Sequence, residues 1–243
     1  MKRLTDVVIA AIVLVLASPV LLVFMFLVSA QDGKTPFYMA PRVSRGGGTF
    51  RMIKLRSMIL NADKAGGSST AVGDLRVTAV GRLIRKFKLD ELTQLYNVLA
   101  GDMSLVGPRP QVRSGGVDLY TDVEMKLLMV RPGITDFSSI IFSDEGDILA
   151  GYPDPDLSYN QLIRPWKSRL GLFYVEHHNI RMDLELMYLT LVAILSKSVA
   201  LNRIGALLIR EGAPPDLVRI ARRDRPLVPT PPPGAQSVVT SIR

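Results

Sequence analysis

A long run of uncharged, mostly apolar residues close to the N-terminus constrains the fold of this chain more than any other feature. Residues 7–30 carry no charged side chain, and a helix of that length measures roughly 36 Å at about 1.5 Å per residue. The hydrocarbon core of a bilayer is about 30 Å thick, so the run predicts a membrane-embedded helix. It exceeds the usual apolar region of a signal peptide, and Val28-Ser29-Ala30 is a weak cleavage site, so we expect it to be retained.

Ser18 and Pro19 lie near the middle of this run. Proline lacks a backbone N–H and its ring presses on the carbonyl four residues earlier, so the helix should bend there, and Ser18 can supply a hydrogen bond to a carbonyl of the preceding turn. The residues alone favour a kinked transmembrane anchor, because kinked spanning helices are common. The alternative is a re-entrant hairpin, which keeps the basic residues on both sides of the run in the cytoplasm.

Composition limits the chemistry. The chain has 243 residues, 48% of them hydrophobic, which is enough for one catalytic domain with accessory segments. It has no cysteine, so any nucleophile must carry oxygen or nitrogen. The net charge of +8 suits anionic partners such as phosphorylated substrates and membrane lipids. We expect no nucleic-acid binding, because the basic residues lack neighbouring aromatic platforms.

The pattern predicts an α+β, mainly helical fold in three segments: a membrane helix at 1–30, a cytoplasmic catalytic domain at 31–202, and an Arg/Pro-rich, partly disordered extension at 203–243. Extended runs at 36–41 and 49–57 flank three glycines and predict a small β-hairpin, and residues 61–76 predict a mobile loop. Periodicity predicts helices at 78–86, 90–100, 120–130 and 182–199, the last of them a core helix or an amphipathic helix at the membrane interface. Residues 152–165 predict a structured loop.

Asp90 and Glu91 open one of these helices. An acidic pair at such a position is usually a capping device that complements the helix dipole. It can also do chemistry, because free N–H groups at a helix start favour an ionised carboxylate and attract phosphate oxygens. An aspartate there can attack phosphorus, and its neighbour can hold a hard cation together with substrate phosphates.

Four sequence blocks follow the apolar segment in a fixed order. They are Lys54-Leu55-Arg56-Ser57-Met58; Leu89-Asp90-Glu91-Leu92 with Gln94, Asn97 and Val98; Gly101-Asp102-Met103-Ser104-Leu105-Val106-Gly107-Pro108-Arg109-Pro110; and Arg131-Pro132-Gly133-Ile134-Thr135. Together they resemble the monotopic phosphoglycosyl transferases, bacterial sugar transferases that prime the assembly of polysaccharides and glycoprotein glycans. The resemblance covers about residues 1–200.

The resemblance implies a reaction and a place for it. Asp90 matches the nucleophile that attacks the β-phosphorus of a UDP-sugar, releases UMP and holds the sugar phosphate covalently. Glu91 matches the acid associated with Mg²⁺ or another hard divalent cation. Polyprenyl (undecaprenyl) phosphate would then accept the sugar 1-phosphate, at the cytoplasmic face of the bacterial inner membrane. The resemblance also favours the re-entrant hairpin over the kinked anchor for residues 1–30, with the break at Ser18 and Pro19 and both ends facing the cytoplasm. A homodimer is left open.

The other residues carried over are expected to bind substrate. Arg85 is expected near the lipid phosphate, Arg109 near the nucleotide, and Lys54 and Arg56 near the diphosphate. The remaining substrate-binding positions are Pro108, Pro110, Pro132, Gly133 and Thr135. The chain departs from the family pattern at Lys88 and Thr93, which flank the acidic helix, and at Asp136, which follows the 132–135 block. The departure at Asp136 concerns sugar or nucleotide contacts made by that loop and not the phosphoryl chemistry.

Two alternatives compete with the enzyme. A non-catalytic bitopic membrane adaptor explains the apolar run and the charge but gives no reason for the ordered blocks. A membrane-tethered nucleic-acid binder would need aromatic platforms beside its basic residues, and this chain has only one Trp and scattered Phe and Tyr. Adjacent His177 and His178 invite a metal site, but their spacing and the lack of a third ligand favour a structural role. Release of UMP distinguishes the enzyme from both alternatives.

Overall fold

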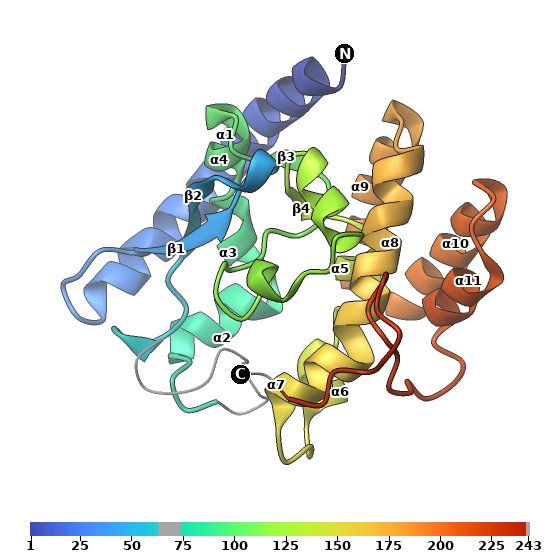
Figure 1. Ribbon diagram of the computed structural model, residues 1–243. Coiled ribbons are helices and arrows are strands. Elements are labelled where there is room, and N and C mark those ends of the chain that lie inside the picture. The colour runs from blue at the N-terminus through green and yellow to red at the C-terminus, as the bar shows by residue number, and fades with distance from the viewer. Residues whose placement is uncertain (63–73, 242–243) are drawn as a thin grey trace.

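A computed structural model describes residues 1–62 and 74–241 (Figure 1). Most of the loop predicted at 61–76 therefore lies outside the described residues. The helices and strands are α1 (Lys2–Ala30), β1 (Phe37–Val43), η1 (Arg45–Gly47), β2 (Thr49–Leu55), α2 (Ala79–Lys86), α3 (Leu89–Leu92), α4 (Leu95–Ala100), β3 (Ser104–Val106), η3 (Val117–Leu119), η4 (Glu124–Met129), β4 (Gly133–Thr135), α5 (Phe137–Ile141), α6 (Glu145–Leu149), α7 (Pro155–Ser158), η5 (Tyr159–Ile163), α8 (Arg164–His177), α9 (Ile180–Leu195), α10 (Lys197–Arg210) and α11 (Pro215–Arg222). The fold is mainly helical, as predicted.

The apolar run forms one helix, α1, with Pro19 inside it. Pro19 has no N–H to offer the carbonyl of Val15, and the Ser18 hydroxyl donates to that oxygen instead, at 2.7 Å. The expected bond from Ser18 is present, and it replaces the one that proline removes. The predicted hairpin of two helical arms is not confirmed, because the helix continues through Ser18 and Pro19. α1 is long and apolar enough to cross a membrane.

The N-terminal end of α1 is fixed to the rest of the fold by polar contacts. The Lys2 ammonium bonds the carboxylate of Asp183 at 2.6 Å. Asp6 is buried, and it accepts hydrogen bonds from the Ser104 hydroxyl at 2.8 Å and from the backbone N–H of Leu105 at 3.2 Å. A carboxylate on an apolar helix is stable only when it is paired in this way, so Asp6 fixes α1 to β3.

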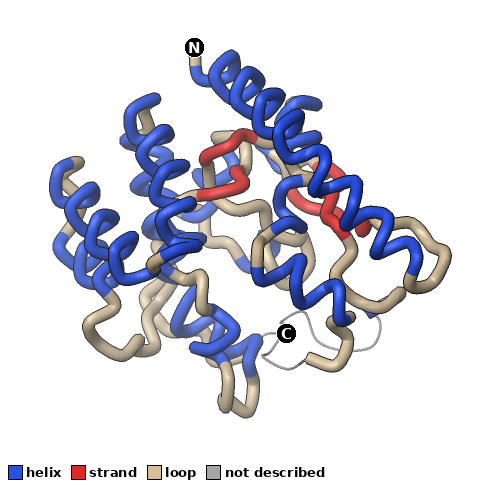
Figure 2. The backbone as a smooth tube through the Cα atoms, turned by 180° about the vertical axis from the view of Figure 1, so that it is seen from behind, coloured by secondary structure: helices blue, strands red, loops and turns tan. Residues whose placement is uncertain are grey.

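The C-terminal end of α1 packs on the same folded unit. Val28 is buried with Leu55 and Ile84, and just beyond the helix Asp32 accepts from the Arg56 guanidinium at 2.7 Å. Figures 1 and 2 show α1 along one edge of the molecule. Its outer face is apolar and exposed; the residues are Leu4, Val8, Ile12, Val15, Leu16, Val20, Leu22, Val23, Phe26 and Leu27.

Two small sheets lie beside α1. β1 and β2 pair antiparallel, with Phe37 opposite Leu55 and Val43 opposite Thr49, which confirms the predicted hairpin. β3 and β4 pair in parallel, with Ser104 next to Gly133 and Val106 next to Thr135. The second sheet joins two of the four sequence blocks, which are separated along the chain.

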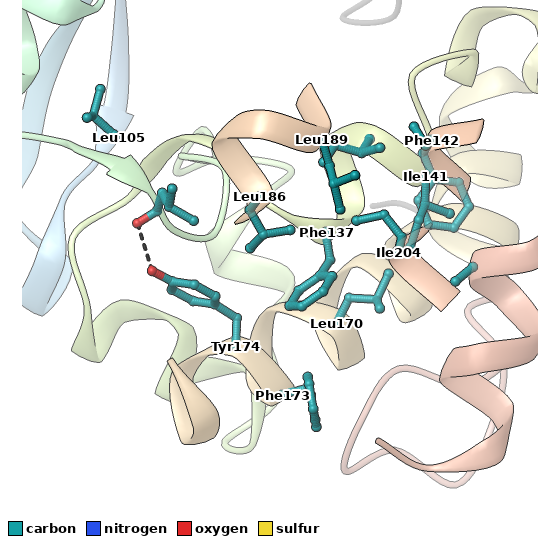
Figure 3. Close-up of a cluster of buried hydrophobic side chains, with 14 of the residues drawn as sticks. Leu105, Phe137, Ile141, Phe142, Leu170, Phe173, Tyr174, Leu186, Leu189 and Ile204 are labelled. Carbon is teal, nitrogen blue, oxygen red and sulfur yellow. Dashed lines mark hydrogen bonds between the residues drawn. The ribbon is translucent and has the colours of Figure 1, made fainter. Parts of the chain in front are cut away.

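The main apolar core lies between the second sheet and the C-terminal helices. α5, α8, α9 and α10 contribute large buried side chains (Figure 3); Phe137, Ile141, Leu170, Leu186, Leu189 and Ile204 are among them. The Tyr174 hydroxyl, buried in this layer, donates to the carbonyl of Val106 at 3.0 Å. The core therefore contacts β3 through Tyr174 and fixes its position.

The structure differs from the sequence predictions in several segments. The helix predicted at 90–100 is divided into α3 and α4, the loop predicted at 152–165 is helical (α7, η5 and the start of α8), and the predicted helix at 182–199 ends at Leu195 before α10 begins. Residues 120–130 form only the short 3₁₀ helix η4.

The C-terminal segment also differs from the prediction. The boundary at 202 falls inside α10, α11 follows it, and the proline-rich end is held to the fold: Arg169 bonds Pro231 O at 2.9 Å and Gln161 bonds Val239 O at 2.7 Å.

Candidate active site

The acidic pair stands on α3, a single helical turn with an unusual entry. Lys88 precedes it in the left-handed region, at φ 52°. At its end the Thr93 hydroxyl lies 3.1 Å from Ile53 O on β2 and 3.0 Å from Asp90 O. Lys88 and Thr93 are two of the three departures from the family pattern. Lys88 marks the start of the turn, and Thr93 attaches its end to β2.

Asn97 fixes the next helix to the same strand. Its side-chain oxygen accepts from the backbone N–H of Ile53 at 2.9 Å, and its amide nitrogen donates to Arg51 O at 2.8 Å. The Asn97 side chain is buried, and its oxygen and its nitrogen each have a hydrogen-bond partner in the β2 backbone. These bonds and those of Thr93 fix the positions of α3 and α4 on β2, and Lys54 on β2 comes close to Asp90 and Glu91.

Arg109 reaches the acidic pair from the segment after β3. Its guanidinium bonds Glu91 Oε1 at 2.7 Å and Ile134 O at 3.4 Å. The segment lies close to β4, because a Cβ on Gly133 would stand 2.1 Å from Gly107 N and one on Gly107 would stand 2.5 Å from Arg131 O. Only glycine fits at both positions, and this close approach is what directs Arg109 toward α3.

The two neighbouring carboxyl groups differ in their electrostatics. Burial raises the pKa of Asp90 above its ordinary value, and Lys54 opposes this only in part. Burial also acts to raise the pKa of Glu91, but the charges of Arg109, Lys88 and Lys54 outweigh it and hold that pKa below its usual range. Glu91 is therefore a fixed anion, whereas Asp90 is an aspartate with its charge less stabilised.

Two further cations belong to this site, Lys54 beside the acidic pair and Arg42 beside Lys54 and Arg109. Burial and the charge of Arg109 lower the pKa of Lys54 to about 8. Arg42, on β1, interacts with Lys54 and Arg109, and burial and Arg109 lower its pKa as well. Arg42 was not among the predicted site residues, because the predicted extended run ended at 41, whereas β1 continues to Val43 and carries Arg42 on the strand that pairs with β2.

Some predicted residues lie elsewhere or act indirectly. Arg56 is buried against the end of α1, where it bonds Asp32 and the carbonyls of Thr35 and Val28, so it anchors the helix and is not in the diphosphate site. Arg85 donates to the Ser57 hydroxyl at 3.0 Å and is near enough to Asp90 to affect its pKa.

The 132–135 block supports the site from behind. Pro132 O accepts from the N–H of Ser104 at 2.9 Å, and Gly133 N–H donates to Pro108 O at 3.0 Å. The Thr135 hydroxyl is buried and bonded to that of Thr190 at 2.6 Å. These residues therefore set the position of Arg109, and their predicted contact with substrate stays a prediction.

The donor set allows a hard cation only together with substrate. The described residues contain no group of three or more His, Asp or Glu side chains that could hold a metal by themselves. Mg²⁺ usually takes one or two carboxylates and completes its shell with phosphate and water. Asp90 and Glu91 fit that pattern, with one Glu91 oxygen already given to Arg109. His177 stacks on Phe173 and bonds a backbone carbonyl, in a structural position.

A pocket lies beside Arg109, between the Pro-Arg-Pro segment, α5 and α8. Its polar lining includes Asp136, Ser138 and Lys167, and the rings of Tyr120 and Tyr159 border it. Asp136 caps α5, accepting from Ser139 N–H at 2.7 Å and from the Ser138 hydroxyl at 2.8 Å. The third departure from the family pattern thus lies at the wall of a pocket that Arg109, the partner of Glu91, also lines.

Comparison with known proteins gives consistent matches. The sequence profile of the bacterial sugar transferase family matches residues 1–197. The chain is 34% identical over 199 residues to UDP-N-acetylgalactosamine-undecaprenyl-phosphate N-acetylgalactosaminephosphotransferase of Aeromonas hydrophila, which covers 80% of this chain and 44% of that protein. It is 33% identical over 215 residues to undecaprenyl-phosphate galactose phosphotransferase of Salmonella typhimurium, covering 82% of this chain and 41% of that protein.

A shorter relative matches along most of its length. An exopolysaccharide production protein of Sinorhizobium fredii is 33% identical over 208 residues, which covers 79% of this chain and 84% of the relative. The chain thus spans less than half of the Aeromonas and Salmonella proteins and most of the Sinorhizobium one.

Proposed function

Because the chain belongs to the bacterial sugar transferase family, we propose that it transfers a sugar 1-phosphate from a UDP-sugar to a polyprenyl phosphate, as the priming step of polysaccharide or glycoconjugate assembly. The observation that carries the proposal is the meeting of three sequence blocks in one site: Asp90 and Glu91, Lys54, and Arg109. Two relatives are named for transfer of a sugar phosphate to undecaprenyl phosphate.

The proposed cycle has two steps. An oxygen of Asp90 attacks the β-phosphorus of the donor, the bond from that phosphorus to the bridging oxygen breaks, and UMP leaves. An oxygen of the polyprenyl phosphate then attacks the same phosphorus, the bond to Asp90 breaks, and the lipid diphosphate sugar departs. The free carboxylate of Asp90 supports this role, since in the described chain its side chain forms no ion pair or hydrogen bond that would occupy it.

Glu91 would hold a divalent cation such as Mg²⁺ alongside the donor phosphates. When bound, the cation would neutralise charge on the diphosphate. The residues of the chain have their own part: Arg109 holds Glu91 in place, and Lys54 contributes positive charge beside Asp90. A donor diphosphate would therefore be bound by groups from β2, α3 and the segment after β3.

The packing of α1 supports a proposal for its arrangement in the membrane. Both of its ends contact the folded unit, through Lys2 and Asp6 at one end and Val28 at the other. A helix that spans the bilayer perpendicularly would leave one end on the far side. We therefore propose that α1 is embedded from the cytoplasmic side of the inner membrane with its apolar face in lipid and both ends on that side.

Release of UMP tests the reaction. Purified protein is incubated with undecaprenyl phosphate, MgCl₂ and each of a set of UDP-sugars that includes UDP-galactose and UDP-N-acetylgalactosamine. UMP release with at least one donor is expected, and chelation should stop it. Absence of release with every donor would leave the non-catalytic adaptor as the better explanation.

Cysteine labelling tests the membrane arrangement. The chain has no native cysteine, so a cysteine inserted after Met1 and Lys34→Cys each provide a single thiol outside the apolar run. Lys2 itself is left in place, because it pairs with Asp183. Both thiols should resist a membrane-impermeant reagent in intact cells and react after the membrane is opened. Labelling of only the inserted thiol in intact cells would establish a spanning helix.

A further inference from the structure

Arg42 lies on the hairpin face that points into the molecule. In the β1–β2 register it stands opposite Phe50, and Ala40 two residues away stands opposite Met52. Phe50, Ala40 and Met52 are all buried in the main core, so this face of the hairpin is the inner one. Arg42 is only partly buried at the end of that face. Arg42 thus lies where the inner face of the hairpin leaves the core, and its guanidinium interacts with Arg109.

Arg42 is held close to the segment that carries Arg109. The backbone N–H of Val43 donates to Gln111 O at 2.9 Å, so β1 and the Pro-Arg-Pro segment are directly bonded although they are far apart in the sequence. Backbone pairing of this kind fixes the relative positions of the two arginines. The arginines interact with each other and with Lys54.

Two of the three cations, Arg109 and Lys54, have carboxylates beside them. Glu91 is paired with Arg109 at 2.7 Å, which leaves Asp90 as the anion nearest to Lys54. Among the described residues Arg42 has no carboxylate partner, and its side-chain hydrogen bond goes to the carbonyl of Pro41 at 2.9 Å. A partly buried guanidinium without a counter-ion is costly, and a bound anion would remove that cost.

We propose that Arg42 is a donor-binding residue that contacts the diphosphate of the UDP-sugar together with Lys54 and Arg109. The inference rests on the proposed function and adds to it a residue from outside the four sequence blocks. A planar guanidinium can give two parallel hydrogen bonds to a phosphate, which a lysine cannot. Arg42 would bind the ground state and the transition state about equally, so its loss acts on KM.

Arg42→Ala and Arg42→Lys test the proposal, with Arg45→Ala as the matched control. Arg45 is an exposed arginine in the turn of the same hairpin. Arg42→Ala should raise the donor KM about 10- to 100-fold with kcat changed less than about threefold, the loss of a charged hydrogen bond to phosphate. Arg42→Lys should lie between Arg42→Ala and wild type, and Arg45→Ala should match wild type.

Binding of UDP, measured calorimetrically on the same proteins, separates this inference from the proposed function. UDP affinity should fall with Arg42→Ala by about the same factor as KM rises, and thermal unfolding should show that each variant is folded. Wild-type KM and UDP affinity in Arg42→Ala would overturn the role of Arg42 while leaving the enzyme intact. Wild-type protein that binds UDP through Arg42 but releases no UMP would overturn the proposed reaction alone. Absence of UDP binding by wild type would overturn both.

Discussion

The two halves of the site treat adjacent carboxylates in opposite ways. In one half, between β2 and α3, Asp90 lies near Lys54 without a direct bond, and burial raises its pKa. In the other, between α3 and the segment after β3, Glu91 is bonded to Arg109 at 2.7 Å and its pKa is lowered. Successive residues of a helix project about 100° apart, so one short turn presents one carboxylate to each half.

The difference indicates a division of labour. A carboxylate held by an arginine is a fixed charge, suited to structure and to cation binding. A carboxylate that lacks a bonded partner keeps its oxygens available for attack on phosphorus. The comparison therefore assigns the covalent step to Asp90 and the electrostatic support to Glu91, and each prediction below removes one of its elements.

Asp90→Asn should have the largest effect. The amide has no anionic oxygen to form the acyl phosphate, so UMP release and covalent labelling by a sugar-labelled donor should fall to background, at least about 10³-fold. Asp118→Asn, at an exposed aspartate, serves as the control and should behave as wild type. Turnover in Asp90→Asn within tenfold of wild type would remove the nucleophile from this half of the site.

Glu91→Gln and Arg109→Gln should each lower kcat/KM about 10²-fold, because each leaves a partly buried charge without its partner. The double variant should lose less than the product of the two single losses, since both changes remove the same ion pair. Steady-state kinetics of the four proteins measure this coupling. Fully multiplicative losses would mean that the pair does not act as one unit.

Raising the pH should weaken donor use about tenfold through the Lys54 half. The pKa of Lys54 is lowered to about 8, so its ammonium is present below that pH and is lost above it. We expect kcat/KM for the donor to fall as the pH rises through about 8. Lys54→Arg should abolish that fall, because a guanidinium stays protonated.

Unfolding does not explain such a loss. A lysine whose folded pKa is below its unfolded value binds fewer protons in the folded state, so its contribution to stability increases as the pH rises from about 8 toward the unfolded value. Thermal unfolding measured across the same pH range serves as the control. An unchanged pH profile in Lys54→Arg would exclude Lys54 as the titrating group.

The sequence predicted the parts of the site that depend on local pattern. The hairpin, the helix start at Thr78 and the acidic turn each follow from turn residues, caps or periodicity, and Thr78 accepts from Gly81 N–H at 2.9 Å as an N-cap should. The grouping of Lys54, Asp90, Glu91 and Arg109 could be predicted only from the family resemblance. Their contacts join segments far apart in the chain.

What the sequence could not predict depends on tertiary partners. Arg56 belongs to the same basic block as Lys54, yet it lies just beyond the end of β2 at Leu55 and bonds Asp32 at the end of α1. The helical periodicity of 90–100 predicts a helical backbone but not which side chains are buried, since Leu95 is buried and Tyr96 is exposed. It also does not reveal that Thr93 bonds Ile53 and divides the helix. Similarly, the Arg/Pro-rich composition predicted partial disorder at 203–243. In the structure Arg169 and Gln161 bond the carbonyls of Pro231 and Val239 in that segment.

Thr93→Val should have the smallest effect and shows how the Asp90 half is held. Valine keeps the shape of threonine but removes the hydroxyl that lies 3.1 Å from Ile53 O and 3.0 Å from Asp90 O. We expect about 1 kcal/mol lower stability, the usual contribution of one hydrogen bond, seen as a lower midpoint in thermal unfolding. The distance between Asp90 and Lys54 should become less defined, so kcat should fall a few-fold. The Glu91–Arg109 half does not use this hydroxyl, so the coupling between Glu91→Gln and Arg109→Gln should be the same in the Thr93→Val background. A change in that coupling would mean that the two halves are not independent.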